Sequence, residues 1–260
     1  MARDGRLNRY MVPTALALVL AVVGLTGYSM LSGSGSDPDS AKPGTAATAP
    51  SSPVPTYEPP RAWTDPERWA TLPRGARSDA HGKDIGFPQT LEGALGMLVA
   101  SSSTLVQPGH TNKAEQLALY ESYFSAADRS TRLRDGLELA GGESDAQLRK
   151  EWGLPAGSEL PQGSYVRARV IAYKVITHSP TEVGVWLLTR VTTKASETEA
   201  ERGSYTRSLA AVRWEQDWKL SVAAYEQTSR AAQEQDEPAI VAPGDPAFSP
   251  AGWTAIREAS

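Results

Sequence analysis

The chain of 260 residues contains no cysteine, which excludes disulfide bonds, thiol catalysis and cysteine-ligated zinc. Histidine is scarce: the chain has three, His81, His110 and His178, each beside turn-forming residues and with no pair at metal-ligand spacing. The sequence also lacks a Gly-rich phosphate loop, a serine-nucleophile elbow and a His-Glu-x-x-His motif. We therefore expect no catalytic residue, no metal and no cofactor.

Basic residues are outnumbered by acidic ones, and the formal net charge is −4. Removing the three Arg and one Asp of residues 1–31 leaves 23 basic and 29 acidic residues, a net charge of about −6. Because binding to a phosphate backbone needs a basic surface, we expect no nucleic-acid partner. The length after residue 31 suits one domain with a real core.

Long apolar runs are absent except for residues 11–31, which carry no charged side chain. At about 1.5 Å per residue this run spans a hydrocarbon core of about 30 Å as one helix. Arg3, Arg6 and Arg9 precede it. The positive-inside bias then predicts a cytoplasmic tail (residues 1–10), a single membrane contact through residues 11–31, and all later residues outside the cell membrane.

A cleaved signal peptide is the alternative, and it would make the protein secreted. Small residues such as Ser32 and Ser34 follow the apolar run, as a cleavage site requires. The length of the run, and the bulky Tyr28 and Met30 near the cleavage position, favour the uncleaved anchor.

The next two segments differ in composition. Residues 32–60 are rich in Pro, Ser, Gly and Ala and have almost no large apolar side chain, which predicts a disordered linker. Residues 61–88 add Trp63, Trp69 and Phe87 among turn residues. We interpret this second segment as an irregular strap that packs on the domain.

Apolar residues at helical spacing predict four helices, which begin at Thr90, Asn112, Thr131 and Ser144. Each start carries a side chain that can cap the first turn. The pair Gly141-Gly142 is interpreted as the end of the third helix, and Gly153 as the end of the fourth.

From Ser164 the apolar period changes from helical to alternating. Four strands are expected, with apolar positions around 166–172, 183–191, 205–214 and 218–222. Residues 215–217 form a hairpin-sized connection between the last two. One face of this meander is predicted to be buried, with these residues on it in the first strand: Val166, Ala168, Val170 and Ala172.

Helices followed by a run of strands predict the α+β class for residues 89–228, with N-terminal helices packed on a curved antiparallel sheet of four or more strands. Residues 229–260 are polar and then Pro-rich, and form a C-terminal tail. Its apolar residues, such as Phe248 and Trp253, either dock on the domain or form a recognition segment. The sequence leaves both open.

Three segments carry a resemblance to a known fold: GSYVRARVIAY at 163–173, TEVGVW at 181–186 and AVRWEQDWKL at 211–220. Over about residues 88–226 the chain resembles actinobacterial membrane-anchored domains of the nuclear-transport-factor-two-like (cystatin-like) superfold. The resemblance implies a cone-shaped sheet closed by helices. The order of tail, anchor, linker and domain is similar to scaffold subunits of type IV secretion and conjugation machines.

Aromatic residues of the helices and strands are the candidates for a pocket or interface: Tyr120, Tyr123, Tyr173, Trp186, Trp214 and Trp218. Tryptophan is common at binding hot spots, but packing in the core is the favoured explanation of these residues. Arginines recur on the predicted strands at Arg167, Arg169, Arg190, Arg207 and Arg213. They form either a solvated outer face or a basic groove for an acidic partner.

These observations favour a non-catalytic, membrane-anchored scaffold of an envelope complex related to conjugation, with protein partners or self-association. The alternative is a binding module for a small ligand or a cell-wall polymer, which would use the cone pocket. An isomerase-like enzyme is the third hypothesis, because the superfold also hosts isomerases.

Overall fold

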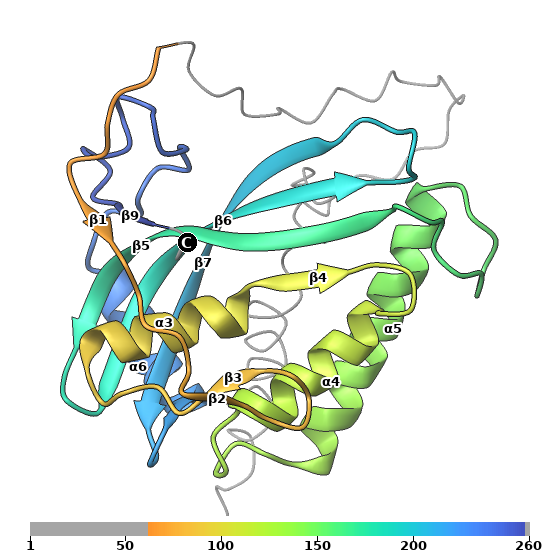
Figure 1. Ribbon diagram of the computed structural model, residues 1–260. Coiled ribbons are helices and arrows are strands. Elements are labelled where there is room, and N and C mark those ends of the chain that lie inside the picture. The colour runs from red at the N-terminus through yellow and green to blue at the C-terminus, as the bar shows by residue number, and fades with distance from the viewer. Residues whose placement is uncertain (1–61, 258–260) are drawn as a thin grey trace, which may run out of the picture.

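The computed structural model describes residues 62–257, which form an α+β domain with four helices and a mixed sheet (Figure 1). The predicted cytoplasmic tail, membrane span and linker at residues 1–60 lie outside the described residues. Between residues 62 and 257, none of the helices combines the length and the apolar character needed to cross a membrane.

The four helices are α3 (Leu91–Ser102), α4 (Asn112–Tyr123), α5 (Thr131–Glu151) and α6 (Val222–Ala232). Each begins after a Ser or Thr whose side-chain oxygen accepts a hydrogen bond from a backbone N–H of the first turn. The predicted cap of α4 is wrong by one residue. Thr111 is the cap and accepts from the Ala114 N–H, whereas Asn112 is the first helical residue.

One continuous helix, α5, replaces the third and fourth helices predicted from the sequence. The prediction that Gly141-Gly142 ends a helix is therefore wrong. Gly141 lies where α5 contacts α4, and a Cβ atom added there would be 2.6 Å from Lys113 Cα. Glycine is needed here for the close approach of two helices, and the α5 backbone continues through it.

Substitution of the two adjacent glycines of α5 should have opposite effects. A Cβ at Gly142 meets nothing within 4 Å, so Gly142→Ala should stabilise the domain by up to about 0.5–1 kcal/mol through helix propensity. Gly141→Ala should destabilise it by about 1–3 kcal/mol, because the backbone of α4 must move. Urea unfolding of both variants tests this; equal effects would show that the α4–α5 contact does not require Gly141.

The main sheet has seven strands in the order β1-β9-β5-β6-β7-β8, with β4 also paired to β5. Its strands are β1 (Trp69–Ala70), β4 (Thr104–Val106), β5 (Tyr165–His178), β6 (Glu182–Lys194), β7 (Arg202–Trp214), β8 (Trp218–Leu220) and β9 (Thr254–Ile256). The four predicted strands correspond to β5–β8. All pairs are antiparallel except β1–β9, so the wholly antiparallel sheet of the prediction is corrected to a mixed one.

Both faces of the sheet carry a cluster of buried apolar residues, whereas the sequence predicted one buried face. The inner face packs on α3, α4 and the strap, and the outer face packs on α6 and the C-terminal segment (Figure 1). A register shift between Val170 and Ala172 resets the alternation along β5. Val170 therefore lies in the inner cluster and Ala172 in the outer one, and the prediction that they share a face is wrong.

The C-terminal segment docks on the domain. Phe248 and Trp253 are almost fully buried, and β9 inserts between β1 and β5. This resolves the choice left open by the sequence in favour of docking for residues 229–257. Helix α6 was not predicted: Val222 was assigned to the fourth strand, but the Ser221 side chain caps a helix that begins at that residue.

Candidate anion-binding cleft

The strap at residues 62–88 forms one wall of a cleft and is held in place by hydrogen bonds from distant elements. The Tyr123 hydroxyl of α4 donates to the carbonyl of Asp84 at 2.9 Å. At the β7–β8 hairpin, the Asp217 carboxylate accepts from the N–H groups of Gly86 and Phe87 at 2.9 and 3.0 Å. The irregular backbone of the strap is thereby fixed by the core.

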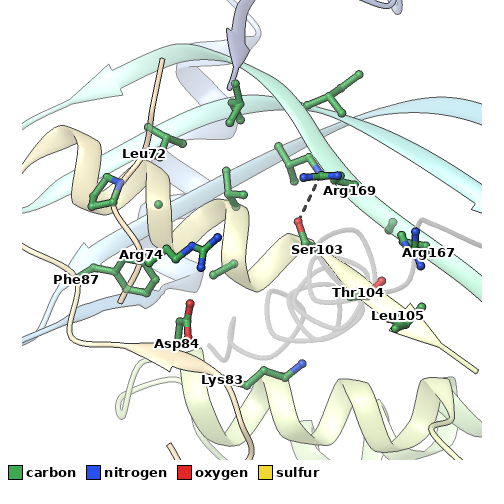
Figure 2. A pocket seen from close by; sticks show the side chains of 18 of the residues that line it. Leu72, Arg74, Lys83, Asp84, Phe87, Ser103, Thr104, Leu105, Arg167 and Arg169 are labelled. Carbon is green, nitrogen blue, oxygen red and sulfur yellow. Dashed lines mark hydrogen bonds between the residues drawn. The ribbon is translucent and has the colours of Figure 1, made fainter. Parts of the chain in front are cut away.

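Within the described residues, a cleft of about 680 Å³ lies between the strap, α3, β4, β5 and the end of β9 (Figure 2). Its floor is apolar and includes Leu72, Phe87, Val99, Val170, Ile171 and Ile256. The remaining walls carry charged side chains. Such a combination of an apolar surface with a few convergent polar groups is typical of ligand sites.

Cationic side chains dominate the walls of the cleft, which include Arg74, Lys83, Arg167, Arg169 and Arg257. The only acidic residues lining it are Asp84 and Glu115, so the fixed charges leave three net positive charges. The whole chain is net negative. The cleft is therefore a local basic site on an acidic protein, which attracts anions and steers them toward it.

Glu115 holds two side chains at the base of the cleft. It is buried in the first turn of α4, and its two oxygens lie 2.6 Å from Lys83 Nζ and 2.7 Å from His110 Nε2. Both oxygens of the carboxylate are thus engaged. Glu115 is suited to position Lys83 and His110, and each of its two oxygens already has a close partner, which does not favour it as a general base.

The edge of β5 has a notch that opens into the cleft. Strand β4 pairs with β5 at residues 166–168 and β9 pairs with it at residues 172–173. Between them, the Ser103 Oγ accepts a hydrogen bond of 3.4 Å from the Val170 N–H (Figure 2). The cleft therefore reaches the edge of β5 next to Arg167 and Arg169, which both line it.

None of the six aromatic residues predicted for a pocket lines this cleft. Tyr120, Tyr123 and Trp218 belong to the inner cluster and Trp186 to the outer one. Tyr173 and Trp214 are partly buried against the inner cluster.

The aromatic residues make structural contacts. The Trp214 and Trp218 rings pack edge to face at 5.4 Å. The Tyr120 hydroxyl donates to the Ser130 carbonyl at 3.1 Å. Burial raises the pKa of Tyr123 above its usual range, with a further contribution from the Asp84 carboxylate. Burial likewise raises the pKa of Tyr173. Both phenols stay protonated at neutral pH, which suits hydrogen-bond donors.

The predicted arginines separate into two groups. Arg167 and Arg169 line the cleft, and Arg190 lies directly opposite Arg169 on β6. Arg213 instead pairs with Glu182 at 2.6 Å, and Arg207 pairs with Glu237 and stacks over the Trp186 ring at 5.2 Å. Of the five predicted arginines, Arg167, Arg169 and Arg190 thus lie near one another at one end of the sheet, and Arg207 and Arg213 have acidic partners elsewhere.

Several cleft residues were not found by sequence reasoning: Arg74, Lys83, Glu115, Arg257 and, as a cleft residue, His110. They lie on the strap, the start of α4 and the end of β9. No shared period links them, so the sequence carried no signal for their convergence. Among residues 62–257, no group of three or more His, Asp or Glu side chains is arranged to hold a metal ion.

Comparison of the chain with known proteins gives no further assignment. No protein-family model matches it, and neither a curated protein nor a solved structure does.

Proposed function

We propose that this domain is a non-catalytic binding module that takes an anionic, partly apolar ligand in the cleft between the strap, α3 and β5. The observation that carries the proposal is the surplus of cations around an apolar floor in a protein of net negative charge. Guanidinium groups bind phosphate and carboxylate through two parallel hydrogen bonds, which favours ligands with such groups.

The remaining hypotheses stay predictions. These are the membrane anchor, a position outside the cytoplasm, the scaffold role in a conjugation-like complex, the isomerase-like activity and the likeness to the nuclear-transport-factor-two-like superfold. Of the hypotheses from the sequence, the small-ligand binding module fits the cleft best, because a scaffold does not require a concave basic site.

Calorimetric titration of the full chain with phenyl phosphate tests the proposal, with benzyl alcohol as the uncharged comparison. Phenyl phosphate should bind and benzyl alcohol should not, since the charge supplies the selectivity. Arg74 reaches from the strap into the cleft (Figure 2), so Arg74→Gln should weaken binding about tenfold, equivalent to about 1.4 kcal/mol.

The matched control is Arg132→Gln, which removes the same charge from an exposed position of α5 that does not line the cleft. It should leave the affinity unchanged. Equal weakening by both variants would mean that phenyl phosphate responds to net charge alone, and the cleft would lose its assignment.

A further inference from the structure

Three arginines share the outer face of the sheet next to the cleft. Arg169 of β5 and Arg190 of β6 are register partners, so their side chains lie on the same face. Arg167 lies two residues before Arg169 and therefore also on this face. All three are exposed, whereas Ala168 and Val170, which alternate with Arg167 and Arg169 along β5, are buried.

This arrangement places like charges at close range. Neighbouring strands are about 4.8 Å apart, and residues two apart on a strand are separated by about 6.7 Å. Guanidinium groups bind phosphate through two parallel hydrogen bonds. Arg167, Arg169 and Arg190 therefore offer neighbouring positions for successive anionic groups of one ligand.

On the side of β7, the surface next to the arginines lacks a protruding side chain, because Gly203 lies there. Gly203 is the register partner of Thr192, which in turn pairs with Arg167. A Cβ atom added at Gly203 would meet nothing within 4 Å. The row formed by Arg167, Thr192 and Gly203 thus leaves space for an extended ligand to lie across β5, β6 and β7. Tyr205 is the register partner of Arg190 on the same face.

We propose that the anion-binding cleft continues over the notched edge of β5 onto this outer face, and that the ligand is a linear polymer of polyol or sugar units joined by phosphodiesters. The C–H groups of its units are the partly apolar portion that lies on the floor of the cleft. The inference rests on the proposed function, because Arg167 and Arg169 belong to both surfaces. The arginines continue from the cleft, at Arg167 and Arg169, to Arg190 on β6. A polymer with repeated anionic groups can contact all of them, whereas a single small anion cannot.

A single-stranded nucleic acid also has phosphodiesters, but it binds mainly through bases stacked on aromatic rings. Here the Tyr165 ring is covered on one side by the Arg167 guanidinium at 5.0 Å, and its hydroxyl bonds to Glu201. Tyr205 is half-buried against the outer cluster. These rings provide little free stacking surface, which favours a polymer without bases.

An anionic membrane surface fits less well. Interfacial binding uses apolar side chains that insert below the head groups. The exposed large apolar residues of the described chain are Trp63, Trp69, Leu139 and Ile240, and none belongs to β5, β6 or β7.

The test compares two probes on the full chain in neutral detergent: a short poly(glycerol phosphate) and phenyl phosphate, each titrated at several salt concentrations. Arg190→Gln should weaken polymer binding several-fold and reduce the slope of log affinity against log salt by about 0.7–1, because one phosphate contact is lost. Phenyl phosphate binding should stay within about twofold, since Arg190 does not line the cleft.

Arg202→Gln is the matched control, because Arg202 is exposed on β7 and pairs with Thr193, on the other face of the sheet. It should change neither titration. If Arg190→Gln binds the polymer as tightly as the unmodified protein does, the proposed continuation onto the outer face is wrong and the cleft assignment stands. If the protein binds the polymer but not phenyl phosphate, the proposed function is wrong. Equal or tighter binding of oligothymidine would overturn the choice of polymer, and so would a preference for micelles with anionic lipid over neutral micelles that Arg190→Gln removes.

Discussion

Trp218→Ala should lower the free energy of unfolding by roughly 3–5 kcal/mol, the cost of truncating a large buried aromatic residue. Trp218 is 1% exposed and packs edge to face on Trp214. Its indole N–H also donates to the Pro88 carbonyl at 2.8 Å, so the substitution frees one end of the strap. The expected loss is a large share of a typical total of about 5–15 kcal/mol.

Thermal and urea unfolding of the full chain measure this effect. Trp63→Ala is the control, because Trp63 is 62% exposed and should change the melting temperature little. An unchanged melting temperature for Trp218→Ala would refute its place in the core and return it to the candidates for ligand contact.

The second large effect is expected at the C-terminal segment. Trp253 is fully buried, and its indole N–H donates to the Ala239 carbonyl at 2.8 Å. Trp253→Ala should therefore also cost roughly 3–5 kcal/mol. Because β9 begins at the next residue, we expect the amides of Ala255 and Arg257 to lose protection from hydrogen exchange before the inner cluster does.

Ile240→Ala is the matched control for the same segment, since Ile240 is 42% exposed. Its effect should stay within about 0.5 kcal/mol. If Trp253→Ala unfolds no more easily than Ile240→Ala, the docked segment contributes little to stability, and its role as a recognition segment regains support.

Local signals predicted much of the secondary structure. The cap at Thr90, the start of α5 near Thr131, the alternation along β6 and β7 and the hairpin at residues 215–217 all depend on residues close together in the chain, and the structure confirms each. Ser221 and the alanines that follow were a readable signal for α6, but Val222 also continued the alternation of β8.

The errors arose where a distant contact decides the outcome. A glycine such as Gly141 can end a helix, or it can allow another helix to pack closely against it. Only the contact with Lys113 of α4 shows that the second role applies here. The register shift near Ile171 moves Ala172 to the other face although the apolar pattern is unbroken. Burial of the outer face depends on residues such as Phe248, which follow the strands by many positions.

The cleft was less predictable than the fold. Arg167 and Arg169 were recognisable as part of a possible basic groove because they recur at period two on one strand. Arg74 and Arg257 occupy an irregular strap and a strand end that are far apart in the sequence. Their convergence depends on the parallel pairing of β1 with β9, which no local pattern indicates.

The pairing of β1 with β9 also bears on the order of folding. The Glu67 N–H donates to Ser249 Oγ across 182 residues, and Arg68 donates to the Trp253 carbonyl across 185. Contacts between such distant residues carry the largest loop-closure entropy, and we expect them to form last. Ile256 and Arg257 line the cleft. We therefore expect that, during synthesis, the helices and the β5–β8 meander assemble first, and that the walls of the cleft are complete only once residue 257 has emerged.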